Sequence, residues 1–177
     1  ELNEDDADYP ALYLANYIFG GGAGLNSRLS ERIRQKEGLS YGVGSNLALS
    51  TVDRDGSWAV EGIAAPQNMA KLEAAFQDEL AKAIANGFTA DEVKSAKSGA
   101  LQKRLQGRAQ DGALAASWVS RLFYGRTFAN SQEFEDKLAA LTPAQVSAAF
   151  RKHIVPGKLT IIKAGDFAKV AKAGAAK

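Results

Sequence analysis

Two stretches of alternating side chains stand next to each other in a chain whose other patterned segments are helical. Residues 40–50 and 57–64 each read as a strand, and residues 53–56 between them end in Asp-Gly, a frequent hairpin turn. A third strand is expected over residues 159–164. The remaining segments have helical spacing, so the sequence predicts an α+β fold: a two-layer arrangement in which a small, mainly antiparallel sheet is covered on one face by several helices.

Roughly seven helices are expected from their start and stop signals. The signals are Asp8 with Pro10, Asn26 or Ser27 with Gly38 as a stop, Pro66 with Gly87 as a stop, a capping box at Thr89 and Glu92, Asp111, Ser131, and Thr142 with Pro143. Three strands are few for so many helices. Either a further strand lies upstream of Glu1, or the open face and edge of the sheet meet another partner.

Composition narrows the class of protein. The 177 residues are 46% hydrophobic, which suits one domain over residues 1–167 with a frayed Ala/Lys-rich tail over 168–177. The net charge of +2 argues against nucleic acid as the main partner. No run of ~18 apolar residues predicts a membrane span. The absence of cysteine excludes disulfides and thiol catalysis. Because the sequence begins without Met, a processed chain or an excised piece is expected, with any targeting signal removed.

The chain contains one histidine, His153. A catalytic zinc site usually takes one or two histidines, and the paired-histidine zinc motifs cannot be formed with one. A self-contained Ser-His-Asp site would have to use His153. Since His153 lies near an expected helix end, a structural role is favoured, such as an interaction with the terminal carbonyls. No metal ligands are therefore assigned to this chain.

A glycine-rich run, Gly20-Gly21-Gly22-Ala23-Gly24, follows the first expected helix. It is neither a phosphate loop nor a dinucleotide fingerprint, because no strand precedes it and no Gly-Lys-Ser/Thr follows. Two interpretations stay open: a flexible connection between helices, or a mobile loop beside a polypeptide-binding surface.

The segment after this run is more specific. It reads Arg34-Gln35-Lys36-Glu37-Gly38-Leu39-Ser40-Tyr41, and it resembles the C-terminal domains of the M16 (pitrilysin/insulinase-like, processing-peptidase-like) zinc peptidases, which carry an Arg seven residues before a Tyr after a glycine-rich loop. The order of elements is similar over essentially the whole chain. The resemblance implies the LuxS/MPP-like metallohydrolase fold, in its metal-free half.

The resemblance also implies a function and a set of site residues. The chain would be the metal-free half of a zinc metalloendopeptidase, inactive alone, closing a chamber around a peptide substrate. Tyr41 would stabilise the oxyanion and Arg34 would hold substrate backbone, roles that suit a phenol donor and a guanidinium fork. Gly21, Gly22 and Gly24 would contribute to substrate binding. Zinc would be bound by an N-terminal half on the same or another chain, and a homo- or hetero-dimer is possible.

Strand alternation raises a question about Tyr41. Simple alternation places it on the same side as Val43 and Leu47, which is the core side. For Tyr41 to face a substrate cavity, either the strand begins later or a bulge forms at Gly42 or Gly44.

The sequence offers three further site candidates. Lys103, Arg104 and Arg108 are expected on a solvated helix face. The aromatic group Trp118, Phe123 and Tyr124 is expected in the core, as aromatic residues at helical spacing usually are. Glu61, among small and apolar residues of the second strand, is a candidate to face the cavity between the halves.

Two other functions remain open. M16-like chains without a zinc half of their own act as substrate-holding partners or structural subunits, and an open three-stranded sheet would also suit a stand-alone peptide-binding module. The retained pair Arg34 and Tyr41 favours the peptidase, because a purely structural subunit has no chemical need for it. A bacterial periplasmic or secreted setting is expected, with a cytoplasmic one as the alternative.

Overall fold

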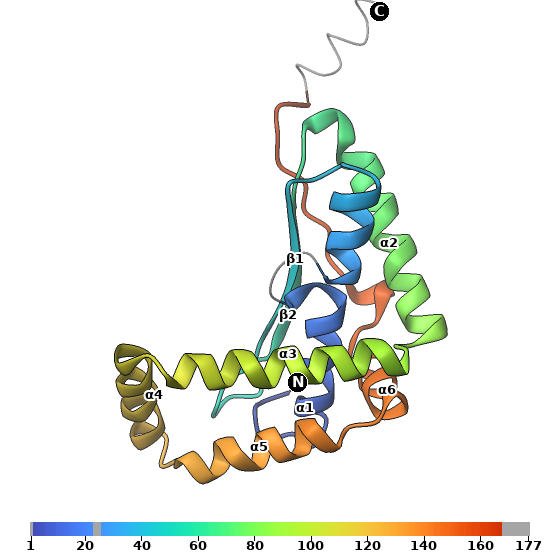
Figure 1. Cartoon of the computed structure of the whole chain (residues 1–177). Coiled ribbons are helices and arrows are strands. Elements are labelled where there is room, and N and C mark those ends of the chain that lie inside the picture. Colours follow the sequence, from blue (N-terminus) through green and yellow to red (C-terminus); the bar gives the residue numbers. More distant parts are fainter. Residues whose placement is uncertain (1, 23–25, 168–177) are drawn as a thin grey trace, which may run out of the picture.

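The computed structural model describes residues 2–22 and 26–167, and it combines one hairpin with helices along the whole chain (Figure 1). The expected tail, residues 168–177, lies outside the described part. The elements in chain order are α1 (Tyr9–Asn16), the π-helices η1 (Tyr17–Gly21) and η2 (Ser30–Lys36), β1 (Gly42–Ala48), β2 (Ser57–Ile63), the 3₁₀ turn η3 (Pro66–Asn68), α2 (Met69–Asn86), α3 (Ala90–Arg108), α4 (Asp111–Phe123), α5 (Phe128–Ala140), α6 (Pro143–His153) and the 3₁₀ turn η4 (Pro156–Lys158).

Strands β1 and β2 pair antiparallel, from Gly42 opposite Ile63 to Ala48 opposite Ser57. One face of the hairpin is lined by half-buried apolar side chains that pack against the helices: Val43, Leu47, Trp58 and Val60. The other face is exposed and carries mostly small residues. The predicted α+β class, with helices on one face of an antiparallel sheet, is therefore confirmed.

The expected third strand was wrong. Within the described residues the sheet has two strands, and residues 159–164 run as an extended segment that pairs with neither. Their pattern is that of a strand, but a strand also needs a neighbouring backbone at hydrogen-bonding distance. A groove separates this segment from β2.

The core is built around the first helical segment. Leu12, Leu14 and Phe19, on α1 and η1, are almost fully buried, as expected for a helix that is apolar nearly all round. The Phe19 ring packs against those of Trp58 and Phe150, at centroid distances of 5.8 and 5.3 Å. One aromatic cluster thus joins the first helix, the sheet and α6.

Most helix boundaries follow the predicted signals. Thr89 and Thr142 form complete capping boxes with Glu92 and Gln145. Ser131 does not cap a helix: α5 begins after Thr127, whose box partner is Asn130, and Ser131 is buried inside the helix. Threonine three residues before a polar amide was the stronger signal.

Asp8 stands at the start of α1 but caps it with no side-chain hydrogen bond. Its carboxylate instead accepts from Lys152 Nζ at 2.6 Å and lies 2.9 Å from His153 Nε2. These contacts hold the pKa of Asp8 below its ordinary value, chiefly through the Lys152 hydrogen bond. The structural role expected for His153 thus takes the form of a contact between α6 and the start of α1.

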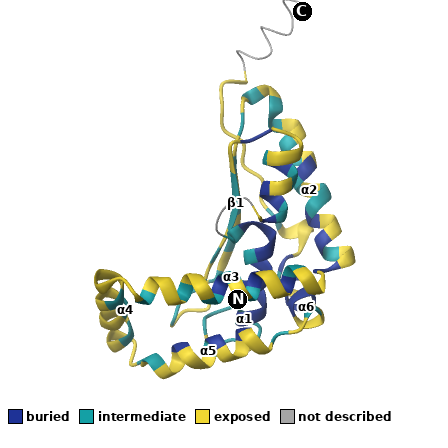
Figure 2. Cartoon of the chain, in the orientation of Figure 1, coloured by how far each residue is buried: buried dark blue, intermediate teal, exposed yellow. Residues whose placement is uncertain are grey.

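Helices α3, α4 and α5 form an arm that extends from the core (Figure 2). Helix α4 buries none of its residues, and Trp118, Phe123 and Tyr124 are 49%, 81% and 44% exposed. The prediction that these aromatics lie in the core was wrong. Phe128 of α5 packs against the Trp118 ring at a centroid distance of 4.7 Å, but Phe123 and Tyr124 contact each other and stay largely at the surface.

The solvated basic face predicted on α3 is observed only in part. Lys103 is exposed, but Arg104 and Arg108 both bind Glu135 of α5, with Arg104 Nε at 2.8 Å from the carboxylate. Hydrogen bonding from Arg108, and then from Arg104, holds the pKa of Glu135 below its ordinary value. Polar contacts of this kind between α3 and α5 leave no trace in the hydrophobic pattern.

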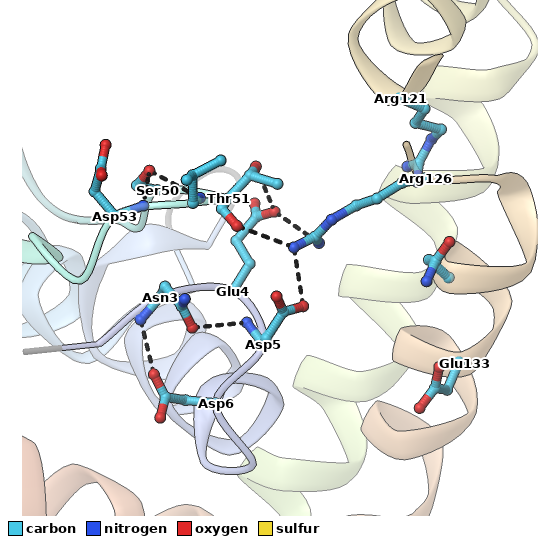
Figure 3. Close-up of polar contacts among 12 residues, drawn as sticks. Asn3, Glu4, Asp5, Asp6, Ser50, Thr51, Asp53, Arg121, Arg126 and Glu133 are labelled. Carbon is cyan, nitrogen blue, oxygen red and sulfur yellow. Dashed lines mark hydrogen bonds and ion pairs between the residues drawn. The ribbon is translucent and has the colours of Figure 1, made fainter. Parts of the chain in front are cut away.

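Arg126, between α4 and α5, attaches the arm to the start of the chain (Figure 3). Its guanidinium donates to Glu4 Oε2 at 3.2 Å, to Asp5 Oδ1 at 2.9 Å and to the Thr51 carbonyl at 3.2 Å. One side chain therefore connects the arm, the N-terminal segment and the hairpin loop.

Candidate functional site

The two residues singled out by the sequence motif lie together. Arg34 is on η2 and Tyr41 directly precedes β1; the Arg34 Cζ atom is 4.8 Å from the centroid of the Tyr41 ring, a cation–π contact. Tyr41 is 85% exposed. The structure thus presents a phenol hydroxyl and a guanidinium side by side on the surface.

A tight reversal of the chain makes this meeting possible. Leu29 and Ile33 anchor the helix of Arg34 in the core, both fully buried. Gly38 then ends the helix with a φ of +60°, a conformation that glycine adopts without steric cost. The Leu39 amide donates back to the Ile33 carbonyl at 2.9 Å. The chain therefore returns past its own helix and brings Tyr41 back to Arg34.

The residue at which β1 begins decides whether Tyr41 follows the alternation of the strand. The strand begins at Gly42, so Tyr41 is outside the ladder and does not follow the alternation of Val43 and Leu47. The buried Ser40 hydroxyl lies 2.7 Å from the carbonyl oxygens of both Gly42 and Ile63 and can donate its one hydrogen to either. Of the two possibilities raised by the sequence, a later strand start is the one observed. No local pattern indicates that Ser40 makes these contacts next to Tyr41.

The glycine run is closely packed where the structure describes it. A Cβ at Gly20 would lie 2.7 Å from the Ser45 amide nitrogen, and one at Gly22 would lie 2.7 Å from the Tyr17 carbonyl oxygen. At Gly21 it would overlap the Asn16 side chain. Packing therefore explains why glycine is needed at 20–22, and no mobility is required. Gly24 lies outside the described residues, and the role of the run in substrate binding stays a prediction.

Asn16 ties this turn to the sheet. Its Oδ1 accepts hydrogen bonds from Ser45 Oγ at 2.7 Å and from Trp58 Nε1 at 2.9 Å. The end of α1 is thereby fixed to both strands. This polar anchor was not found from the sequence, because nothing local marks Asn16 as different from any other helical asparagine.

Glu61 lies on the exposed face of β2, opposite Gly44 and on the same face as Asn46. Among the described residues, none forms an ion pair or hydrogen bond with its carboxylate. It belongs with the uncovered side of the hairpin. Whether that side faces a cavity between two halves stays a prediction.

Metal binding finds no support among the residues that the structure describes. No group of three or more His, Cys, Asp or Glu side chains there is arranged to hold a metal ion. His153 is engaged with Asp8. Among residues 2–22 and 26–167, no helix is long and apolar enough to cross a membrane.

A cavity of about 300 Å³ lies between the N-terminal segment, α3 and α5. Its lining is strongly charged, with Glu4, Asp5, Arg104 and Arg126 among the residues. These four side chains are already in ion pairs. The cavity is thus part of the attachment of the arm, and it brings together none of the motif residues.

Comparison with known proteins identifies the family to which the chain belongs. The family model described as the peptidase M16 inactive domain matches residues 2–100. A structure of a peptidase M16 inactive domain from Pseudomonas fluorescens superposes with a TM-score of 0.73 and 29% identity, over 87% of this chain and 36% of that one. No sequence among curated proteins matches significantly.

Two more distant structures share the fold. The inactive peptidase domain of a candidate zinc protease from Bordetella parapertussis matches with a TM-score of 0.71 and 16% identity, over 89% of this chain and 83% of that one. A protease from Helicobacter pylori matches with a TM-score of 0.72 and 15% identity, over 85% of this chain and 35% of that one. The chain thus spans about a third of the length of the Pseudomonas and Helicobacter proteins.

Proposed function

The chain belongs to the peptidase M16 family as its inactive domain, and from that membership we propose that it is the metal-free half of a zinc metalloendopeptidase. In this role it closes the substrate chamber and contributes Arg34 and Tyr41 to the reaction. The observation that carries the proposal is the pairing of these two side chains, exposed and in contact, at the end of the hairpin.

Each side chain has a distinct task. The Tyr41 hydroxyl donates a hydrogen bond to the oxyanion that develops on the scissile carbonyl, where a positioned donor has its largest effect on rate. The Arg34 guanidinium binds a substrate backbone carbonyl through its forked N–H groups. Its position over the Tyr41 ring restricts where the hydroxyl points.

The residues that the structure describes do not fit a zinc site. The described residues offer no ligand cluster, and their histidine is bound to Asp8. The metal, its ligands and the catalytic base are therefore assigned to an N-terminal half, on the same or another chain. This half supplies hydrogen-bond donors and one wall of the chamber.

Reconstitution tests the proposal. The zinc-bearing half and this chain, purified separately and mixed, should hydrolyse an unstructured peptide much faster than the zinc half alone. Arg34→Ala should raise KM for the peptide, because it removes a contact to substrate backbone. Lys36→Ala, an exposed residue of the same helix paired with Glu31, serves as the matched control and should leave KM unchanged.

Two results would oppose the proposal. If the mixture is no more active than the zinc half alone, the chain is a substrate-holding or structural partner. If Arg34→Ala and Lys36→Ala behave alike, the motif arginine has no part in substrate binding.

A further inference from the structure

A cavity of about 230 Å³ lies inside the arm, between α3, α4 and α5, where α4 joins the far ends of the other two helices (Figure 1). We call it the arm cavity. Three guanidinium groups line it, those of Arg104, Arg108 and Arg121, and the apolar side chains of Leu114 and Phe128 line it as well. No Asp or Glu of the described residues is among its lining residues. The arm cavity therefore combines a strongly basic part with an apolar part.

The positive charges of the arm cavity exceed the negative charges that pair with them. Arg104 and Arg108 share one partner, Glu135, whose carboxylate oxygens lie 2.8 Å from Arg104 Nε and 3.2 Å from Arg108 Nη2. Arg121 forms no ion pair with any described carboxylate. Its guanidinium makes long contacts, to Ser117 Oγ at 3.3 Å and to a backbone carbonyl oxygen at 3.4 Å. Three positive charges are thus set against one negative charge, an excess of two.

Arg121 is half-buried in these surroundings. Burial is the main cause that lowers the pKa of its guanidinium, and the charges of three neighbouring arginines, Arg104, Arg126 and Arg108, lower it further. The charge of Glu4 acts in the opposite direction, but Glu4 does not line the arm cavity, and its carboxylate accepts a hydrogen bond from Arg126. Arginine stays protonated at neutral pH in spite of such a shift. An anion in the cavity would therefore be attracted by several positive charges at once.

The lining also limits the kind of anion that fits. The other two guanidiniums are engaged with Glu135, so Arg121 supplies one fork of N–H groups, which suits the two oxygens of a carboxylate. Leu114 and Phe128 offer contact to hydrocarbon, and Arg121 Cζ lies 5.3 Å from the centroid of the Phe128 ring. The basic and apolar parts of the lining are thus adjacent. Pockets for drug-sized ligands measure ~300–1,000 Å³, so the arm cavity suits a smaller molecule.

We propose that the arm cavity binds a carboxylate carried on a short apolar group, from a free organic acid or from the C-terminus of a peptide. Arg121 binds the two carboxylate oxygens, and the other two arginines contribute their positive charge. Leu114 and Phe128 contact the apolar group. The arm cavity shares no residue with the pair Arg34 and Tyr41, so this proposal does not depend on peptidase activity and can fail without affecting the proposed function.

Titration of the isotope-labelled chain with benzoate, followed by NMR, tests the proposal. Benzoate should cause saturable shifts of the amides that line the arm cavity and should leave those of α1 unchanged. Benzamide, which has nearly the same shape without the charge, should bind at least ~10-fold more weakly, because hydrogen bonds between charged groups are the stronger ones. Inorganic phosphate should also bind at least ~10-fold more weakly, because it leaves the apolar part of the lining uncovered.

Three variants assign the binding to this cavity. Arg121→Gln should weaken benzoate binding at least ~10-fold, and Arg121→Lys, which keeps the charge without the fork, should give a smaller loss. Lys103→Gln is the matched control for the loss of one positive charge, since Lys103 is an exposed residue of α3 outside the cavity lining. It should bind benzoate like the wild type. The amide spectrum of each variant shows whether it is folded.

A second titration distinguishes the two sources of the carboxylate. If N-acetyl-glycyl-phenylalanine binds at least as tightly as benzoate, the cavity takes peptide C-termini; if it binds more weakly, the cavity takes free organic acids. The absence of saturable shifts with both probes would overturn the proposal. Equal binding of benzoate and benzamide, or of benzoate and phosphate, would also overturn it, as would an Arg121→Gln variant that binds benzoate like Lys103→Gln.

Discussion

The body and the arm of this molecule are held together by different forces. In the body, Phe19, Phe150 and Leu14 are completely buried, and the aromatic cluster joins helices to sheet. In the arm, α3 and α5 bury a few residues such as Val93 and Leu138, but α4 buries nothing. Guanidinium–carboxylate contacts at Glu135 join α3 to α5, and those at Glu4 and Asp5 attach the arm to the start of the chain. Hydrophobic burial therefore defines the body, while burial decreases along the arm and charged contacts add to what holds it in place.

This contrast predicts very different costs for the same aromatic truncation. Phe150→Ala should lower the free energy of unfolding by ~3–5 kcal/mol, since it leaves a cavity among packed rings. Phe123→Ala on α4 should change it by less than ~0.5 kcal/mol, because the ring is 81% exposed. Urea unfolding of both variants measures the difference. Similar losses would show that the α4 aromatics are packed in solution.

The charged contact between α3 and α5 should contribute less to the free energy of unfolding than a core ring, but more than an exposed ion pair. Glu135→Gln should cost ~1.5–3 kcal/mol, the usual range for hydrogen bonds to charged groups. Glu133→Gln on the same helix is the matched control: its pair with Lys137 is exposed and should be worth ~0–1 kcal/mol. If the two variants lowered the free energy of unfolding equally, Glu135 would contribute no more than an exposed ion pair.

The same contact predicts a pH dependence with a definite sign. The pKa of Glu135 is lowered in the folded state from its ordinary value of 4.5, so the folded protein binds the proton less tightly than the unfolded chain. Its stabilisation is complete above pH ~4.5 and is lost as pH falls through the folded-state pKa. The difference in unfolding free energy between the wild type and Glu135→Gln should thus be constant near neutral pH and shrink in acid. A difference that persists unchanged in strong acid would contradict this.

The attachment through Arg126 should have the smallest effect on global stability. Asp5 in this contact is largely exposed, so Arg126→Ala should cost ~0.2–1 kcal/mol. Its main consequence is local: amides at the α4–α5 connection should exchange faster, while those of α1 and α6 stay the same. Arg54→Ala, which breaks a pair with Asp6, should leave the arm unaffected.

The sequence predicted the body far better than the arm, for a physical reason. Apolar spacing and capping boxes are local signals, and they correctly placed the helices that bury Phe19 and Phe150. The same spacing misassigned Phe123, which is 81% exposed, because a helix face becomes core only if another element covers it. The expected strand at 159–164 was wrong for a related reason, since a ladder also depends on a neighbour that local pattern does not reveal.

The candidate site also has features that local sequence patterns predict and features that they do not. The motif residues Arg34 and Tyr41 were identified from the sequence, and the structure brings them into contact. Alternation did not decide on which side Tyr41 lies, because β1 begins only at Gly42. The buried Ser40 hydroxyl contacts the Ile63 carbonyl just before the strand begins. Contacts between distant residues, such as Ser40 with Ile63, have no periodicity from which to predict them.

The most direct test of the central claim is the turnover of Tyr41→Phe in the assembled peptidase, compared with Tyr124→Phe. Phenylalanine keeps the ring beneath Arg34 and removes only the hydroxyl, so the account predicts a fall in kcat of ~10²–10³ with KM nearly unchanged. Tyr124→Phe, on the arm, should turn over like the wild type. Unchanged kcat in Tyr41→Phe would contradict the account and remove the proposed role of this chain in the chemical step.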